Sequence, residues 1–418
     1  MLFACITPLF AILLFKDSAI VRKVLDMNAD YPIVVFSHLR WDFVYQRPQH
    51  LLSRLAADHN VYFIEEPIYE ENASAYWEPS KPTKGVTVYR PHLPVGGPGF
   101  NDEQLPLLKR LVRELLASEE LEDKGYVIWV YTPMALPLAK SLAPIAVVYD
   151  CMDELSAFKS APPELIDREA ELLQWADVVF TGGPSLYRAK RGKHDNLHCF
   201  PSSVDATHFA AAKSSREAAE QASFAHPRLG FFGVVDERMD VDLLDALAQA
   251  HPEWQIVIVG PVVKIDPAAL PSHPNLHFVG PSSYADLPSY LAGWDVCLLP
   301  FALNESTRFI SPTKTLEYLA AEKPIVSTPI TDVVEPYEGI VYVGRTQQEF
   351  IAACEQALSA SKEERAIRAA KGQQVLARTS WDETARSIES LIDKAVEKNR
   401  ISEPGTTQTD TSSSYAEV

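Results

Sequence analysis

Residues 311–326 read SPTKTLEYLAAEKPIV and carry the strongest structural signal in the chain. Ser311 is a good N-cap, and Pro312 suits the first helical position, where its missing N–H costs nothing. An apolar stripe follows at helical spacing, and Pro324 then ends the helix and begins a short apolar strand at 324–328. The stretch therefore predicts a capped helix that leads directly into a buried strand.

Lys314 and Glu317 indicate that this helix start could also bind a ligand. The free N–H groups at a helix N-terminus bind anions, and a cation there opposes the helix dipole, so Lys314 is an odd choice for stability alone. Glu317 lies one turn later on roughly the same face, where a carboxylate can grip ribose hydroxyls. The pair predicts a nucleotide-sugar site. The alternative is an ordinary capped helix with an i,i+3 Lys–Glu pair, and these residues alone do not decide between the two.

Short apolar runs alternate with helical patterns on both sides of this stretch. They lie at 33–36, 61–64, 86–89, 127–131, 146–149, 178–181, 197–200, 229–232, 255–259, 276–279, 296–299, 325–327 and 340–343. Continuous rather than alternating hydrophobicity indicates strands that are covered on both faces. Because the alternation restarts after a Ser/Ala-rich stretch, we predict an α/β protein of two Rossmann-like domains, with parallel sheets facing an interdomain cleft.

Composition narrows the function classes. The chain has 418 residues, enough for two domains, and its net charge of -18 argues against a general nucleic-acid binder. Five scattered cysteines without metal-ligand spacing suggest reduced thiols and a cytoplasmic protein. The first residues are apolar but short for a bilayer span, so we interpret 1–27 as a weak membrane anchor or as a misassigned start. The basic residues at 188–193 are either a contact for anionic lipid or a solvated turn.

Open α/β sheets bind ligands at the carboxyl ends of their strands, so the residues after each strand are the site candidates. The loop 37–50, SHLRWDFVYQRPQH, is dense in aromatic, basic and amide groups. Aromatic rings stack on sugars, and Arg and Gln bond to hydroxyls or phosphates. The candidates are His38 for catalysis and Arg40, Trp41, Asp42, Gln46 and Arg47 for acceptor binding. The alternative is a polar surface loop folded on its own Trp.

Three carboxylates follow the run at 146–149. Asp150 and Asp153 are candidate catalytic residues, because a carboxylate at a strand end can act as a general base or orient an acceptor hydroxyl. They could equally be acids favoured by a helix dipole, and we interpret Glu154 as a capping or surface residue.

In the second half, Gly233 follows a strand and leads to Arg238, which outlines a diphosphate-binding turn. Lys264, after the next strand, can supply a second cation or be a solvated lysine. No segment has the pattern of a Walker loop, a zinc site or a nucleophile elbow, so no metal is expected.

Several segments, in this order, resemble GT-B glycosyltransferases of the large family 4 (group 1) superfamily. They are ADVVFT at 176–181, FPSSVD at 200–205 followed by Phe209, DVCLLP at 295–300, and 311–326. The loop 37–50 resembles that of bacterial polysaccharide glycosyltransferases of the teichuronic-acid type. The chain departs from the family at two positions: Phe309 stands where a glutamate is usual, and Met239 stands where a lysine is usual.

The resemblance implies transfer of a glycosyl group from a nucleoside diphosphate sugar to a glycan or lipid-linked acceptor in polysaccharide biosynthesis, with no bound cofactor and no nucleic-acid partner. Glu317 would hold the donor ribose, and Asp150 or its neighbours would face the reacting sugar. The groups that would face the diphosphate are Gly233, Arg238, Lys264, Ser311, Pro312, Thr313 and Lys314. The protein would be cytoplasmic, with peripheral contact to the inner face of the plasma membrane as a variant of that expectation.

The implied domains are an acceptor domain at 28–205, a linker at 206–225, a nucleotide-sugar domain at 226–360, helices that pack across both domains at 361–400, and a disordered tail at 401–418. Two other functions stay open. One is a nucleotide-sugar epimerase-like enzyme, and the other is a catalytically inactive glycan-binding scaffold of the same fold, which the missing acid at Phe309 favours.

Overall fold

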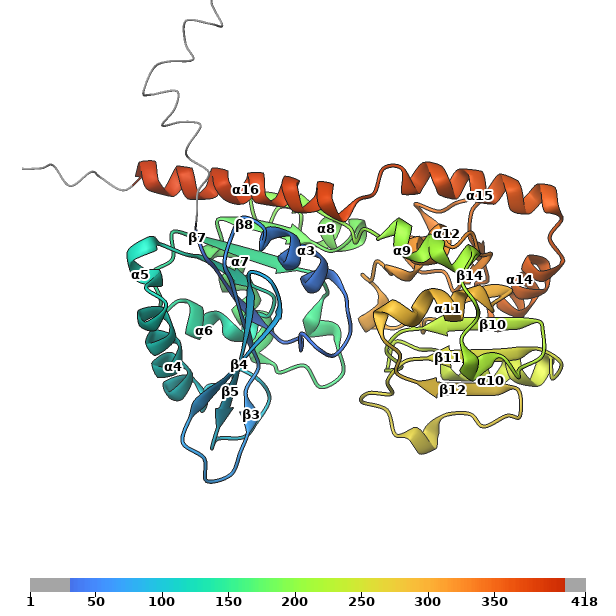
Figure 1. Cartoon of the computed structure of the whole chain (residues 1–418), viewed down its shortest axis with the longest axis horizontal. Coiled ribbons are helices and arrows are strands. Elements are labelled where there is room, and N and C mark those ends of the chain that lie inside the picture. Colours follow the sequence, from blue (N-terminus) through green and yellow to red (C-terminus); the bar gives the residue numbers. More distant parts are fainter. Residues whose placement is uncertain (1–30, 403–418) are drawn as a thin grey trace, which may run out of the picture.

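The computed structural model describes residues 31–402, which form two α/β lobes joined along one side by the last two helices (Figure 1). The expected segment at 1–27 and most of the expected tail lie outside these residues. Within the described part, no helix is long and apolar enough to cross a membrane.

The N-terminal sheet is parallel except for one added strand. Its order is β3–β5–β2–β1–β6–β7–β8–β9, and β4 pairs with β5 in antiparallel orientation. The strands are β1 (Ile33–Ser37), β2 (Val61–Glu65), β3 (Ile68–Tyr69), β4 (Tyr76–Thr83), β5 (Val86–Leu93), β6 (Val127–Val130), β7 (Ala146–Cys151), β8 (Val178–Thr181) and β9 (Leu197–Cys199).

Helices cover both faces of this sheet, which explains the continuous hydrophobicity of its strands. In β1, Val34 and Phe36 join one buried cluster with α4 (Leu105–Ser118), whereas Ile33 and Val35 join the cluster on the other face with α3 (Arg47–Leu55). The remaining helices of this domain are α5 (Leu121–Lys124), α6 (Leu136–Ala139), α7 (Glu164–Trp175) and α8 (Pro184–Lys190). Burial on both faces supplies most of the stability of such a sheet.

The second sheet is entirely parallel, in the order β12–β11–β10–β13–β14–β15. Its strands are β10 (Arg228–Phe232), β11 (Gln255–Val259), β12 (Leu276–Gly280), β13 (Val296–Leu299), β14 (Ile325–Ser327) and β15 (Tyr342–Val343). The helices of this half are α9 (Ala206–Ala210), α10 (Val241–Ala250), α11 (Leu287–Ala292), α12 (Lys314–Ala320), α13 (Thr331–Val334) and α14 (Gln347–Ser359). The order 12–11–10–13 reverses direction beside β10, and the carboxyl ends of strands at such a reversal form a ligand crevice.

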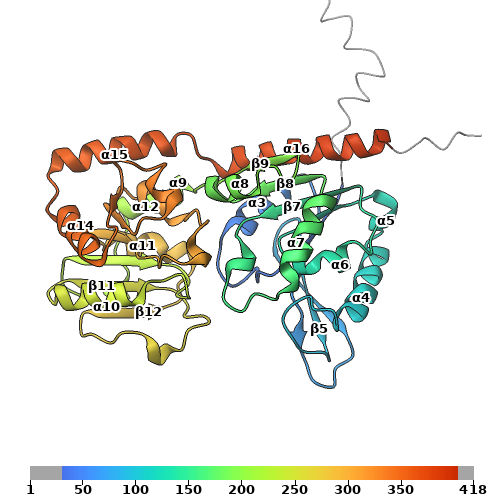
Figure 2. The same cartoon turned by 180° about the vertical axis from the view of Figure 1, so that it is seen from behind.

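The two C-terminal helices each cover a different domain. Helix α15 (Lys362–Leu376) packs against α12 of the second domain, and α16 (Trp381–Ser402) packs against α3 and β7 of the first. Figures 1 and 2 show them end to end along one side of the molecule. Trp381 is buried at the start of α16 and stacks on His50 of α3 with ring centroids 4.6 Å apart. The chain therefore returns to its first domain after completing its second.

The predicted fold class is confirmed, and each predicted apolar run overlaps a strand. Two details differ. Strands β3 and β4 were not predicted, because β4 is an exposed edge strand with two prolines and no apolar run. Helix α12 begins at Lys314, with Thr313 as its N-cap residue, so the expected Ser311 cap and the Pro312 first turn are wrong. The turn 311–313 precedes the helix as irregular chain.

Candidate functional site

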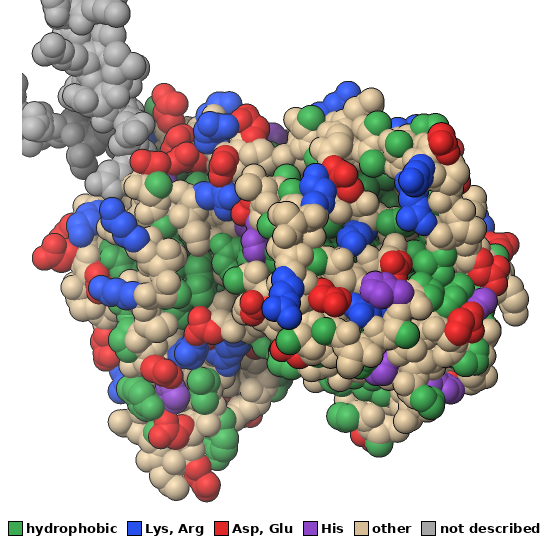
Figure 3. Space-filling view, turned by 45° about the vertical axis from the view of Figure 1, so that its right-hand side comes forward, with side chains coloured by type: hydrophobic (Ala, Val, Ile, Leu, Met, Phe, Trp, Pro, Cys, Tyr) green, Lys and Arg blue, Asp and Glu red, His purple; other side chains and the backbone are tan. Residues whose placement is uncertain are grey.

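A cleft with a volume of about 510 Å³ lies between the two domains. Figure 3 shows a notch between the lobes, with charged side chains of both signs spread over the visible face. Many residues singled out in the sequence line the cleft: Trp41, Asp42, Gln46, Arg47, Asp153, Gly233, Arg238, Ser311, Pro312, Thr313, Lys314 and Glu317. The cleft is thus built from the loop after β1, the loop after β7 and the strand ends of the second sheet.

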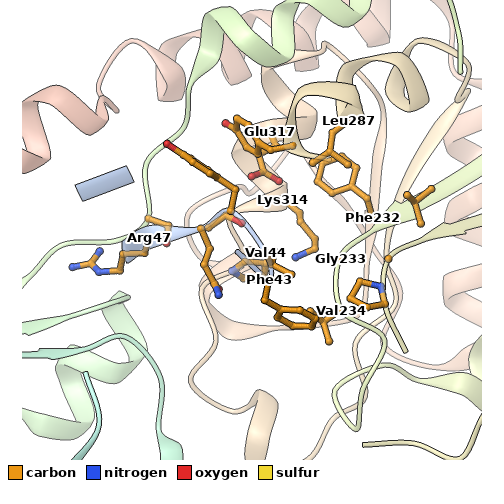
Figure 4. Close-up of a pocket in the computed structure, with 18 of the residues that line it drawn as sticks. Phe43, Val44, Arg47, Phe232, Gly233, Val234, Leu287, Lys314 and Glu317 are labelled. Carbon is orange, nitrogen blue, oxygen red and sulfur yellow. The ribbon is translucent and has the colours of Figure 1, made fainter. Parts of the chain in front are cut away.

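Gly233, after β10, and Lys314, at the start of α12, lie against each other in the cleft. A Cβ atom on Gly233 would stand 2.3 Å from Lys314 Cε and 2.8 Å from Nζ, and the φ of Gly233 is +141°, so only glycine fits here. Figure 4 shows the end of the Lys314 side chain beside Gly233. Removal from solvent lowers the pKa of Lys314. The amine is held at the turn after β10.

Glu317 lies one helical turn beyond Lys314, in the same cleft (Figure 4). Desolvation raises the pKa of Glu317 to about 7, and the positive charge of Lys314 opposes that shift. Leu287, at the start of α11, lines the same part of the cleft. A carboxylate at this place can accept hydrogen bonds from hydroxyl groups of a ligand.

Arg238 supplies a second cation to the cleft. Its guanidinium makes a forked ion pair with Asp236, with Nε 3.0 Å from Oδ1 and Nη2 2.6 Å from Oδ2, and the Phe158 ring lies 5.4 Å away. Burial lowers the pKa of Arg238, but Asp236 opposes this effect strongly enough to raise it overall. The pairing fixes the orientation of Arg238 toward the cleft.

Asp153 is the acid that the first domain presents to these cations. It lines the cleft, and burial raises the pKa of Asp153 while the charges of Arg238 and Lys314 oppose the rise. Asp153 therefore shares the cleft with Arg238 and Lys314 of the second domain.

Asp150 and Arg47 do not present their charged groups to the cleft. Asp150 is fully buried and accepts a forked pair of bonds from Arg47, with Nε 2.9 Å from Oδ2 and Nη2 2.9 Å from Oδ1. Arg47 Nη1 also donates to the Phe200 carbonyl at 2.7 Å, and Figure 4 shows the guanidinium turned away from Lys314. The pair joins α3, β7 and the start of the interdomain segment, so Asp150 can influence the cleft only through position.

Three other candidates lie outside the cleft lining. Arg40 binds Glu65 at 3.1 Å and the Glu66 carbonyl at 2.6 Å. His38 has a buried Nδ1 without a partner among the described residues, and burial lowers its pKa to about 4, with the charge of Lys264 adding to the effect. Lys264, the third of these candidates, does not line the cleft either.

The two departures from the family pattern have local explanations. Phe309 packs against the buried cluster of the first domain, so an interdomain apolar contact occupies the position of the usual acid. Met239 is buried in the core of the second domain, where a lysine would lose its hydration.

The sequence did not single out several residues of the cleft. Phe43 is 49% exposed and Tyr45 is 41% exposed, and both line the cleft from the loop after β1. Tyr284 lines it from the segment after β12. Their positions after strands were a signal, but aromatic residues are common in loops.

Lys190 and Glu154 are not the surface residues that the sequence suggested. Lys190 is buried and binds Glu169 at 2.6 Å and Glu154 at 2.7 Å. The turn at 188–193 is therefore not a uniformly solvated basic patch, and Glu154 is part of a buried ion-pair cluster.

Comparison with known proteins agrees with this geometry. Residues 226–360 match the family model for glycosyl transferases group 1. The matched residues lie in the second domain. A Bacillus subtilis (strain 168) protein named as a teichuronic acid biosynthesis glycosyltransferase, TuaH, is 26% identical over 257 residues, which cover 57% of this chain and 64% of that protein's length.

Solved structures show the same two-domain arrangement, the GT-B fold. The sucrose-phosphate synthase of Thermosynechococcus elongatus is 15% identical with a TM-score of 0.69, and the match covers 88% of this chain and all of that one. An E. coli trehalose-6-phosphate structure bound with UDP-2-fluoro glucose is 14% identical with a TM-score of 0.62, over 87% of this chain and 99% of that one.

Proposed function

We propose that this protein is a glycosyltransferase that moves a sugar from a nucleoside diphosphate sugar to a glycan or lipid-linked acceptor in polysaccharide biosynthesis. The observation that carries the proposal is the group Gly233, Lys314 and Glu317, held in one cleft of a group 1 glycosyl transferase domain. The domain match, the similarity to TuaH and the UDP-sugar bound in a structure of the same fold support it.

The second domain would hold the donor. The diphosphate would lie at the turn after β10, against Lys314, with Arg238 on the same wall and residues 311–313 beside them. Glu317 would accept hydrogen bonds from the ribose. When the bond to the sugar breaks, negative charge develops on the leaving diphosphate, and fixed cations in a water-poor cleft stabilise it most at that moment.

The first domain would hold the acceptor and the reacting sugar. Asp153 lines the cleft with Arg238 and Lys314 and would orient a hydroxyl near the anomeric carbon. Asp42 and the exposed ring of Phe43 offer hydrogen-bonding and stacking surface for a sugar, whereas Trp41 is buried against Phe63 at the base of this surface. Asp150 and Arg47 would act as positioning residues beneath this surface.

We also propose a cytoplasmic location, with peripheral membrane contact where the acceptor is lipid-linked. The four described cysteines, Cys151, Cys199, Cys297 and Cys354, are all free thiols, as expected in a reducing compartment.

The test is to incubate the purified protein with a panel of nucleotide sugars and candidate acceptors and to measure release of the nucleoside diphosphate. Wild type should release it, and Lys314→Ala should reduce kcat by about 100- to 1000-fold, as expected when one charge-stabilising group is lost. Glu317→Ala should mainly raise KM for the donor. Full activity in both variants, with folding shown by circular dichroism, would contradict the donor site.

Two further measurements, of the nucleotide sugar after incubation without acceptor and of nucleotide binding, separate the alternatives. An epimerase-like enzyme would convert the nucleotide sugar without any acceptor, and a scaffold would bind no nucleotide. Glu305→Ala is a matched control, because Glu305 is an exposed acid outside the cleft lining, and its removal should leave kcat and KM unchanged.

A further inference from the structure

Tyr284 lines the cleft, and its hydroxyl is buried without a hydrogen-bond partner among the described residues. Among the described residues, several buried side-chain N or O atoms have no hydrogen-bond partner, and Tyr284 is the one among them whose residue lines the cleft. A buried polar atom without a partner is costly, and native proteins retain few of them. In a binding cleft, the natural explanation is a partner that arrives with the ligand.

The ring that carries this hydroxyl is held on both faces. His208 stacks on one side at 4.4 Å between centroids, and Tyr45 of the first domain lies at 4.6 Å on the same ring. His208 Nε2 also lies 2.9 Å from the Tyr284 carbonyl oxygen. The hydroxyl oxygen of Tyr284 is therefore fixed in place, and only the hydroxyl hydrogen can rotate.

The neighbourhood points to the ribose end of the donor. Tyr284 and Glu317 line the same cleft, and the negative charge of Glu317 adds to burial in raising the pKa of Tyr284. A carboxylate can only accept hydrogen bonds, whereas a phenolic hydroxyl both donates and accepts. A ribose hydroxyl could donate to Glu317 and at the same time accept from Tyr284.

We infer that the Tyr284 hydroxyl is a second hydrogen-bonding group for the donor's ribose, beside Glu317, and that it makes the site prefer a ribonucleotide over a deoxyribonucleotide. The inference deepens the proposed function and rests on it. Tyr45 reaches the same ring from the other domain, so this ribose subsite is completed when the domains are together.

The test is calorimetric titration of wild type, Tyr284→Phe and Thr315→Val with UDP and GDP and with their 2′-deoxy and 3′-deoxy forms. Tyr284→Phe should weaken binding of the preferred nucleotide about 3- to 10-fold, the effect of one lost hydrogen bond. The penalty for one of the deoxy forms should shrink by the same factor, because the same hydrogen bond is already missing. The melting temperature without ligand should stay equal or rise, because an unpaired hydroxyl has been removed.

Thr315→Val is the matched control, since the Thr315 hydroxyl is also buried and unpaired but lies outside the cleft lining. Its nucleotide affinity should equal that of wild type. Unchanged affinity in Tyr284→Phe, unchanged deoxy penalties, or a marked loss of melting temperature would each overturn the inference while leaving the proposed function standing. A wild type that binds no nucleotide would overturn both.

Discussion

At the scale of single residues, the sequence was most informative where a side chain conflicts with local stability. Lys314 is unfavourable near a helix start, and the structure places its amine beside Gly233 in the cleft. Asp150 gave the opposite result, because its partner Arg47 is 103 residues away and nothing local reveals the pairing. An acid at a strand end looks the same in sequence whether it faces a ligand or a buried arginine.

Glu317 makes donor binding pH-dependent. With a pKa of about 7, the carboxylate is about 10% ionised at pH 6 and about 90% ionised at pH 8. If the ionised form accepts the ribose hydroxyls, nucleotide affinity should rise nearly tenfold across that range. Calorimetry at both pH values measures it, and Glu317→Gln should remove the dependence. An equal pH dependence in Glu317→Gln would show that another group titrates.

The raised pKa of Glu317 also makes the stability of the protein depend on pH. The folded-state pKa lies above the unfolded value, so the folded protein binds more protons between pH 4.5 and 7, and Glu317 lowers stability as the pH rises through that window. Without ligand, Glu317→Gln should therefore melt above wild type at pH 8 and close to it at pH 4.5.

At the scale of elements, strands buried on both faces could be predicted and other features could not. Continuous apolar runs identified the parallel strands, whereas β4 pairs at an exposed edge and carries no such run. The start of α12 was placed two residues early, because Ser311 and Pro312 have the residue types of a cap but are used in the cleft wall. Residue types alone do not show which of two roles a turn fulfils.

The Asp150–Arg47 ion pair should contribute to the stability of the protein, because it joins α3 to β7. Asp150→Ala leaves a buried, unpaired guanidinium and should cost about 3–5 kcal/mol of unfolding free energy. Replacing both partners, as Asp150→Leu with Arg47→Met, should cost clearly less, because no charge stays unpaired. Denaturant titration measures both.

The control for that experiment is Glu383→Ala, which removes an exposed pair with Arg386 and should change stability by less than about 0.5 kcal/mol. A loss in Asp150→Ala no larger than in this control would mean that the buried pair is not a structural link.

At the scale of the whole molecule, contacts between the domains decide the shape of the cleft. Asp332 of the second domain accepts the Ser185 backbone N–H at 3.0 Å, at the start of α8 in the first domain. Glu237 accepts the Lys159 N–H at 2.7 Å, and Phe309 packs on the first domain's core. The sequence predicted two domains and a cleft, but these pairings connect residues 78 and 147 positions apart and have no local signature.

Helix α16 should stabilise the first domain by packing against it. Trp381→Ala removes a buried ring that stacks on His50, and a cost of about 3–5 kcal/mol is expected for a tryptophan truncated in a core. Burial lowers the pKa of His50 to about 3, so the stack persists as a neutral pair at physiological pH. Scanning calorimetry should show a lower melting temperature.

Ile401→Ala is the control on the same helix, because Ile401 is 76% exposed and its truncation should leave the melting temperature unchanged. Equal melting temperatures for Trp381→Ala and wild type would contradict a structural role for the returning helix.

The central claim is that the cleft binds a nucleoside diphosphate through Lys314, and calorimetric titration tests it most directly. Wild type should bind UDP or GDP, and it should bind the matching nucleoside far more weakly, because the diphosphate supplies the contact with Lys314. Lys314→Ala should lose about 100-fold in affinity for the diphosphate and little for the nucleoside. Absence of nucleotide binding in wild type, or equal affinity in Lys314→Ala, would contradict the claim.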